Sequence, residues 1–113
     1  MKEDCKLFVY GSLAPGQHNH HIMDTMTGVW SPAYTYGYID KCDRGEYRGY
    51  PAFTPDKNGE KITGLLFISA DLPNHWARLD EFEGIHYKRV IIEAFLEDSQ
   101  KELCNIYQIL PVR

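Results

Sequence analysis

The sequence predicts an α+β fold, in which a mostly β body carries one principal helix and a second, short helix. Three observations support this prediction: apolar segments with the length of strands at residues 6–10 and 62–69, a helical pattern between residues 71 and 84, and a candidate hairpin after residue 87. The chain has 113 residues and 43% hydrophobic content. These values suit one packed core, so we expect a single domain over residues 1–113.

The first half of the chain begins with a clear strand that ends in a sharp turn. Residues 6–10, KLFVY, are largely apolar, and residues 11–16 contain two glycines and a proline. Residues 18–25 are expected to form one or two helical turns. Residues 28–40 are rich in aromatic and β-branched side chains but contain Pro32 and Gly37, so we expect an irregular or bulged strand.

The second half begins with a polar segment and then becomes regular. Residues 41–60 are polar and glycine-rich apart from a Tyr-Pro-Ala-Phe patch, and we assign them no element. Residues 62–69, ITGLLFIS, form the most continuous apolar strand candidate, which is expected in the middle of the sheet. Residues 87–95 and 103–110 predict an antiparallel hairpin, joined by a charged turn at residues 97–100.

Composition excludes several classes of function. Twelve basic and sixteen acidic residues give a net charge of −4, and no basic run is interleaved with aromatic residues, so neither nucleic acid nor a membrane surface is an expected partner. The N-terminal segment has no signal-peptide core, and a cytoplasmic location is expected. Cys5, Cys42 and Cys104 are odd in number and widely spaced, which predicts reduced thiols without a disulfide framework or metal knuckle.

The principal helix has residues suited to both of its ends, and its last turn is unusually acidic. Asp71 can cap the helix, Pro73 is tolerated in the first turn, and Gly84 can end it. The motif LDEFEG places three carboxylates at the C-terminal end, where the helix dipole disfavours negative charge. Because this placement is unfavourable, the role of each carboxylate has to be considered separately.

A helical wheel separates the three acids. With Leu72 at zero and an advance of about 100° per residue, Glu83 falls near 20° on the apolar stripe, Asp80 near 80° on the flank and Glu81 near 180° on the opposite face. A carboxylate turned toward apolar surroundings is desolvated, and its pKa rises toward the range of a general acid and base. The alternative is that the stripe ends before Glu83 and leaves it solvated at a frayed helix end.

Two acids do not make a glycosidase pair here. Such a pair must converge on one bond, with carboxyl groups about 5–9.5 Å apart. Glu81 and Glu83 lie on opposite helix faces, so they are a poor dyad. If the motif is catalytic, a single inward carboxylate must serve.

The loop after the first strand is a second candidate site. In VYGSLAPG, the backbone N–H groups around Gly11, Ser12 and Leu13 can form a concave nest, because glycine allows the chain to turn and to approach a ligand closely. Such a nest suits a carboxylate. An ordinary tight turn is the alternative explanation for the same residues.

Together these motifs resemble the γ-glutamylcyclotransferase-like family. The resemblance rests on YGSL at the end of a strand, a following G-x-x-N, and LDEFEG followed by Tyr87-Lys88-Arg89, and it extends from residue 7 to about residue 107. The chain is most similar to the short bacterial and γ-glutamylamine-type members. Ala14 and Pro15 follow the YGSL motif where the glutathione-specific branch usually has Ile-Trp, which disfavours that branch.

The resemblance implies a fold, a reaction and a set of site residues. The implied fold is a small mixed β-barrel flanked by helices, with a cavity at the end of the first strand. The backbone of Tyr10, Gly11, Ser12 and Leu13 would hold the α-carboxylate of a γ-glutamyl group. Glu83 maps onto the catalytic glutamate, which moves a proton so that the substrate amine attacks its own γ-carbonyl and releases 5-oxoproline and a free amine.

The resemblance gives the remaining residues supporting roles. Tyr87 and Tyr107 are expected to hydrogen-bond in the cavity or to pack in the core. Arg89 is expected to be a structural ion-pair partner and Asn19 to tie down the loop. Tyr50 and the proline after it match a patch at the pocket rim, for which surface packing is an equal alternative.

No metal or cofactor is expected. Ring closure to a five-membered lactam is intramolecular and needs orientation and one proton shuttle, without a metal or an enzyme nucleophile. The run of His18, Asn19, His20 and His21 lacks an obvious third ligand and is better described as a solvated junction.

The rival to an enzyme is a non-catalytic module that binds a small molecule in the same cavity. The expected partner in both cases is a small γ-glutamyl compound, and the chain is expected to be a monomer or homodimer. The sequence does not identify the amine side of the substrate.

Overall fold

The computed structural model describes residues 2–11, 15–16, 20–41 and 51–110. Six strands and one α-helix are present in these residues, together with short 3₁₀ turns at Glu3–Cys5, His20–Met23 and Leu72–Asn74. The strands are β1 (Lys6–Val9), β2 (Val29–Lys41), β3 (Pro51–Pro55), β4 (Glu60–Ile68), β5 (Tyr87–Leu96) and β6 (Lys101–Ile109), and the helix is α1 (Trp76–Glu83).

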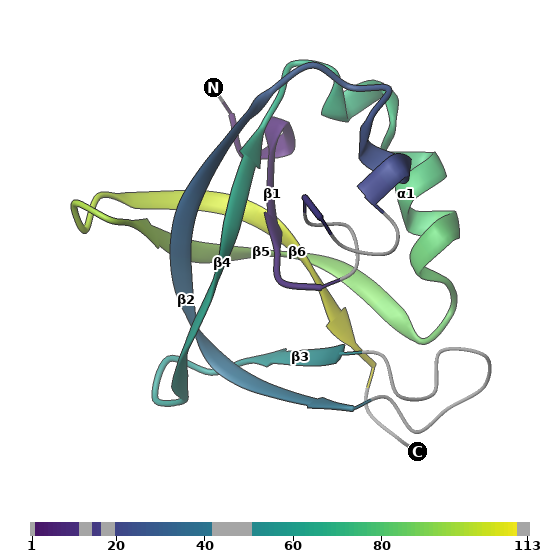
Figure 1. The fold of residues 1–113 in the computed structure, drawn as a ribbon. Helices are drawn as coiled ribbons and strands as arrows, with labels where there is room; N and C mark the ends of the chain where they lie inside the picture. The colour runs from purple at the N-terminus through teal and green to yellow at the C-terminus, as the bar shows by residue number, and fades with distance from the viewer. Residues whose placement is uncertain (1, 12–14, 17–19, 42–50, 111–113) are drawn as a thin grey trace.

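Five of the strands close into a barrel (Figure 1). The order is β2-β4-β1-β6-β5, and a short pairing of β5 with β2 at Ala33 and Tyr34 completes the ring. The β1–β6 pair is parallel and the other pairs are antiparallel, so the barrel is mixed. β3 pairs with β2 outside the ring and lies below the barrel in Figure 1. The α+β class and the small mixed barrel are therefore confirmed.

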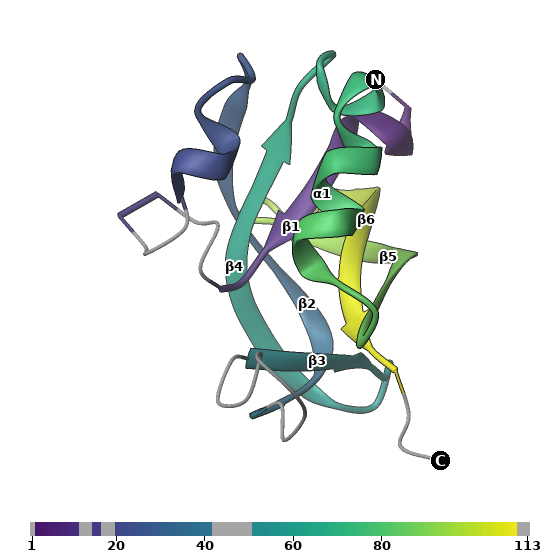
Figure 2. The same cartoon turned by 90° about the vertical axis from the view of Figure 1, so that its right-hand side faces the viewer.

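The side chains of β1 divide the core into two parts. Phe8 packs inside the barrel with residues such as Phe53, Leu66 and Ile106. Leu7 and Val9 alternate with it, as strand geometry requires, and face the helix. Figure 2 shows α1 in front of β1 and β6. One face of the barrel is thus covered by the helix, and the candidate site lies at this junction.

The principal helix is shorter than predicted. Leu72–Asn74 forms a separate 3₁₀ turn that contains Pro73, and α1 begins only at Trp76. The prediction that Asp71 caps the helix is wrong, because its carboxylate accepts a hydrogen bond from the backbone N–H of Thr27 at 2.9 Å instead. The Asp71 carboxylate therefore bonds to a residue 44 positions away in sequence and not to the N-terminus of the helix.

The C-terminal end of the helix follows the prediction. Gly84 follows the last helical residue with φ of +87°, a conformation that favours glycine, and its N–H donates to the carbonyl of Asp80 at 3.1 Å. This cap fixes the position of the last turn and of Glu83.

β2 is one continuous strand of 13 residues, in contrast to the irregular strand predicted. The carbonyl of Tyr36 accepts from Asp56 outside the β4 ladder, so the even-numbered residues of β2 direct their backbone groups away from β4. Pro32, which has no N–H, therefore removes no bond from the β2–β4 pair. The ladder continues through it, with Pro32 opposite Leu65.

Gly37 allows β3 to pair closely with the end of β2. A Cβ atom at this position would lie 2.3 Å from the carbonyl oxygen of Thr54. β3 was not predicted from the sequence, because its two prolines and polar surroundings hide a strand whose pairing depends on this close approach. No helix in the described part of the chain is long and apolar enough to cross a membrane.

Gly37→Ala should weaken the fold. The added methyl group meets the β3 backbone, which must shift, so we expect the free energy of unfolding to fall by about 1–3 kcal/mol in urea denaturation. Thr54→Ser, at the exposed residue whose carbonyl lies against Gly37, is the control and should change this value by less than about 0.5 kcal/mol. Equal stability of Gly37→Ala and the wild type would contradict the close approach.

Candidate active site

Glu83 is the inward carboxylate of the last helical turn. It is half-buried, whereas Asp80 and Glu81 are exposed, which confirms the orientation predicted from the helical wheel. Burial raises its pKa from 4.5 to about 7. A carboxyl group with this pKa can accept a proton in one step and donate it in the next near neutral pH.

Tyr10 follows β1 directly and lies close to Glu83. Its hydroxyl donates to the carbonyl of Tyr107 at 2.8 Å, and its ring contacts Phe53 with centroids 5.6 Å apart. Burial first, and then the charges of Glu83 and Tyr87, raise the pKa of this hydroxyl. Tyr10 therefore stays neutral and remains a hydrogen-bond donor beside the carboxylate.

Tyr87 and Tyr107 complete the group of buried tyrosines around Glu83. Both belong to the core cluster that faces the helix. The Tyr107 hydroxyl donates to Oδ1 of Asp80 at 2.6 Å. Burial and this bond to Asp80, with a smaller contribution from Glu83, raise the pKa of Tyr107. The hydroxyl and carbonyl of Tyr107 are both engaged within the protein, so its predicted substrate contact stays a prediction.

The loop that was predicted to bind a carboxylate is only partly described. Gly11 follows Tyr10 and is half-buried. Ser12, Leu13, Asn19 and Tyr50 lie outside the described residues. The structure thus brings Glu83, Tyr10, Tyr87 and Tyr107 together, and the predicted role of the backbone nest stays a prediction.

Comparison with known proteins gives this arrangement a family. A family model described as gamma-glutamyl cyclotransferase, AIG2-like, matches residues 7–112. The chain belongs to this family. AIG2-like protein C from Arabidopsis thaliana is 28% identical over 99 residues, which cover 86% of this chain and 54% of that protein. The chain thus spans about half the length of this curated relative.

Solved structures of other proteins show the same fold. An AIG2-like protein from Mus musculus is 22% identical with a TM-score of 0.72, and the match covers 96% of this chain and 79% of that one. YkqA from Bacillus subtilis is 24% identical with a TM-score of 0.70, covering 93% and 35% of the two chains. A structure described as gamma-glutamyl cyclotransferase is 13% identical with a TM-score of 0.68, covering 96% and 68%.

In this member of the gamma-glutamyl cyclotransferase, AIG2-like family, Asp80 fixes the helix to the barrel. The helical wheel placed it on the flank of the helix, and its carboxylate bonds side chains of β5 and β6. Arg89 donates from Nε to Oδ1 at 2.9 Å, and the hydroxyl of Tyr107 donates to the same oxygen. Arg89 also lies over the Trp76 ring, 4.2 Å from its centroid, and reaches Oδ1 of Asn105 at 3.3 Å.

This network confirms the predicted ion-pair role of Arg89 and identifies Asp80 as its partner, which the sequence did not reveal. The opposite charges of Asp80 and Arg89 in consecutive elements were the available signal, but a wheel describes one helix and says nothing of the strand that follows it. A pocket of about 290 Å³ lies beside the pair, lined by Asp80, Tyr87, Lys88, Arg89 and Tyr107.

The described histidines and cysteines that could bind a metal or act as nucleophiles are arranged as structural residues. His20 pairs with Asp24 at 3.3 Å and contacts the Trp30 ring, while His18 and Cys42 lie outside the described residues. Cys5 and Cys104 are free, and burial raises the pKa of Cys104 to about 12, which disfavours the reactive thiolate. Within the described ranges, no three His, Cys, Asp or Glu side chains gather closely enough to hold a metal ion.

Burial of Glu83 should make stability depend on pH. Its folded-state pKa of about 7 exceeds the ordinary value of 4.5, so the fold favours the protonated form. This stabilisation is complete below the unfolded pKa and is lost as pH rises through the folded pKa. From pH 4.5 to pH 7, the free energy of unfolding of the wild type should fall by up to about 3 kcal/mol relative to Glu83→Gln.

Urea denaturation at several pH values measures this difference. Glu81→Gln, on the exposed face of the same turn, should give a curve parallel to that of the wild type. If the curve of Glu83→Gln is also parallel, Glu83 is not desolvated and the account of its pKa fails.

Proposed function

We propose that the protein is a cofactor-independent cyclotransferase that releases 5-oxoproline and a free amine from a small γ-glutamyl amide. The observation that carries the proposal is the position of Glu83, a half-buried carboxylate with a pKa raised to about 7 beside the end of β1. Membership of the gamma-glutamyl cyclotransferase, AIG2-like family supports the same reaction.

The proposed reaction needs one proton shuttle. Glu83 accepts a proton from the α-ammonium group of the substrate, and the free amine attacks the γ-carbonyl carbon to close a five-membered ring. The tetrahedral intermediate collapses, the bond from carbon to the leaving nitrogen breaks, and Glu83 returns the proton to that nitrogen. The ring nitrogen then gives up its remaining extra proton through Glu83, and the freed amine leaves as an ammonium ion. Because its pKa lies near neutrality, Glu83 is suited to both transfers.

Orientation supplies most of the remaining acceleration. The attacking amine and the γ-carbonyl belong to one molecule, so the protein has to hold a bent conformation in which the two groups meet. We propose that the backbone of Tyr10, Gly11, Ser12 and Leu13 binds the α-carboxylate and keeps the α-amine near Glu83. The neutral, buried hydroxyl of Tyr10 lies close to the carboxylate of Glu83.

The test is a panel of γ-glutamyl amino acids and γ-glutamyl amines assayed for 5-oxoproline and the free amine. We expect turnover of at least one member, and loss of the proton shuttle in Glu83→Gln should lower kcat by about 10²–10⁴-fold. Glu81→Gln is the matched control, because it removes a charge from the exposed face of the same turn.

Two outcomes oppose the proposal in different ways. Unchanged turnover in Glu83→Gln would remove Glu83 from the mechanism. Binding of the panel without turnover, in wild-type protein of native stability, would instead support a non-catalytic binding module with the same cavity.

A further inference from the structure

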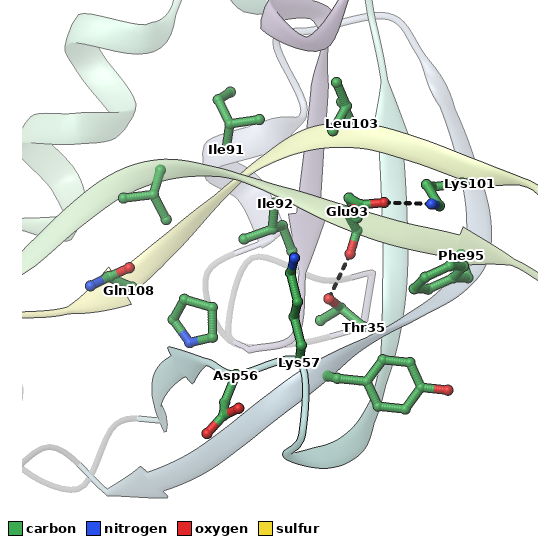
Figure 3. A pocket seen from close by; sticks show the side chains of 13 residues that line it. Thr35, Asp56, Lys57, Ile91, Ile92, Glu93, Phe95, Lys101, Leu103 and Gln108 are labelled. Carbon is green, nitrogen blue, oxygen red and sulfur yellow. Dashed lines mark hydrogen bonds and ion pairs between the residues drawn. The ribbon is translucent and has the colours of Figure 1, made fainter.

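A second concave surface lies on the barrel, at the point where β5 separates from β2. The two strands pair only at Ala33 and Tyr34, and β3 then occupies the same edge of β2. The space between β5 and the turn after β3 forms a groove of about 740 Å³ (Figure 3). We call it the β5-edge groove; Glu83 and the three tyrosines around it are not among its lining residues.

The hydrogen-bond pattern of β5 leaves one edge of the strand open to this groove. Leu96 donates to Gln100 in the turn to β6, so even-numbered residues of β5 direct their backbone groups toward β6. Odd-numbered residues direct theirs the other way, and accordingly the Glu93 carbonyl accepts from the Thr35 hydroxyl at 2.8 Å. Before Phe95, no described strand pairs with β5 on this side, which leaves the N–H and C=O of Ile91 and the N–H of Glu93 directed outward.

The side chains confirm that the groove follows the strand edge. Successive side chains of a strand point to opposite faces, yet Val90 and Ile92 from one face and Ile91 and Glu93 from the other all line the groove. A depression over a single face would be lined by alternate residues only. Ile92 points toward Lys57 and Ile91 points to the other side of the strand (Figure 3), so the open backbone edge lies in the groove between the two faces.

Lys57 places a positive charge in the middle of the groove, which Asp56, Glu93 and Lys101 also line. Lys57 extends from the turn after β3 toward Ile92, while the Asp56 carboxylate is turned away from β5 (Figure 3). Asp56 accepts from the N–H of Asn58, and Glu93 pairs with Lys101 at 2.9 Å. The bond to Lys101 and, to a smaller extent, the charge of Lys57 lower the pKa of Glu93, but among the described residues Lys57 forms no salt bridge, so an acidic group in the groove can pair with it.

We propose that the β5-edge groove binds an extended peptide segment, which adds a strand to β5 and places an acidic side chain at Lys57. An extended main chain presents donors and acceptors at the spacing of the open β5 edge, and alternate apolar side chains can cover Val90 and Ile92. The ligand is thus a peptide strand of a partner protein. This proposal is independent of the cyclotransferase reaction.

The probe is a blocked hexapeptide of alternating valine and glutamate, acetyl-VEVEVE-amide, titrated into the whole protein. Backbone amide exchange followed by NMR is the measurement, because strand addition protects only the outward amides. We expect slower exchange at Ile91 and Glu93 when peptide is present, and little change at Val90 and Ile92, which already bond to β6. Saturating peptide without protection of Ile91 and Glu93 would overturn the proposal.

Variants separate the backbone contact from the charge. Ile91→Pro removes an N–H that points to the groove and not to β6, so the ladder can remain while peptide affinity falls about tenfold. Ile91→Ala keeps that N–H and should bind within about threefold of the wild type.

Lys57→Glu is a second test that leaves β5 unchanged. It should lower the affinity for acetyl-VEVEVE-amide about fivefold and raise the affinity for the charge-reversed acetyl-VKVKVK-amide by a similar factor. This reversal of the peptide preference tests the proposal even if Ile91→Pro does not fold. Equal binding of both peptides by wild type and variant, or pairing of two copies of the chain through Ile91 in place of peptide, would overturn it.

Discussion

The contact of Asp80 with Arg89 and Tyr107 determines where the last turn of α1 lies on the barrel. One carboxylate accepts hydrogen bonds from a guanidinium of β5 and a hydroxyl of β6, and the Gly84 cap ends the helix one turn later. Glu83 is three residues after Asp80, so the same anchoring turns it toward the barrel and away from water. An exposed pair of this kind contributes little to stability by itself, but it fixes geometry.

The strand β5 contributes to two separate surfaces of the fold. The N-terminal end of the strand supplies Tyr87 and Arg89 to the junction with the helix, where a carboxylate can hold a proton near neutral pH. Farther along, the strand leaves β2 and its edge is open beside Lys57. The first surface is the proposed site of a small γ-glutamyl compound and the second the proposed site of an extended peptide, so the two proposed ligands would not compete for the same residues.

The sequence predicted features that depend on local pattern and did not predict those that depend on distant partners. Strand periodicity located β1, β4 and the β5–β6 hairpin, and the helical wheel selected Glu83 from three acids. Asp71 was assigned to a cap because Thr27, its actual partner, is distant in sequence. The continuity of β2 through Pro32 depends on which edge of the strand lacks a partner, and the Asp80–Arg89 pair joins elements that a wheel treats separately.

Burial of its carboxyl group lets Glu83 carry a proton near neutral pH. NMR titration of side-chain carboxyl carbons measures this directly, with Glu81 as the reference in the same sample. We expect a midpoint of about 7 for Glu83. A Glu83 midpoint near the ordinary value of 4.5 would contradict the claim, because a solvated carboxylate cannot serve as the proposed proton shuttle.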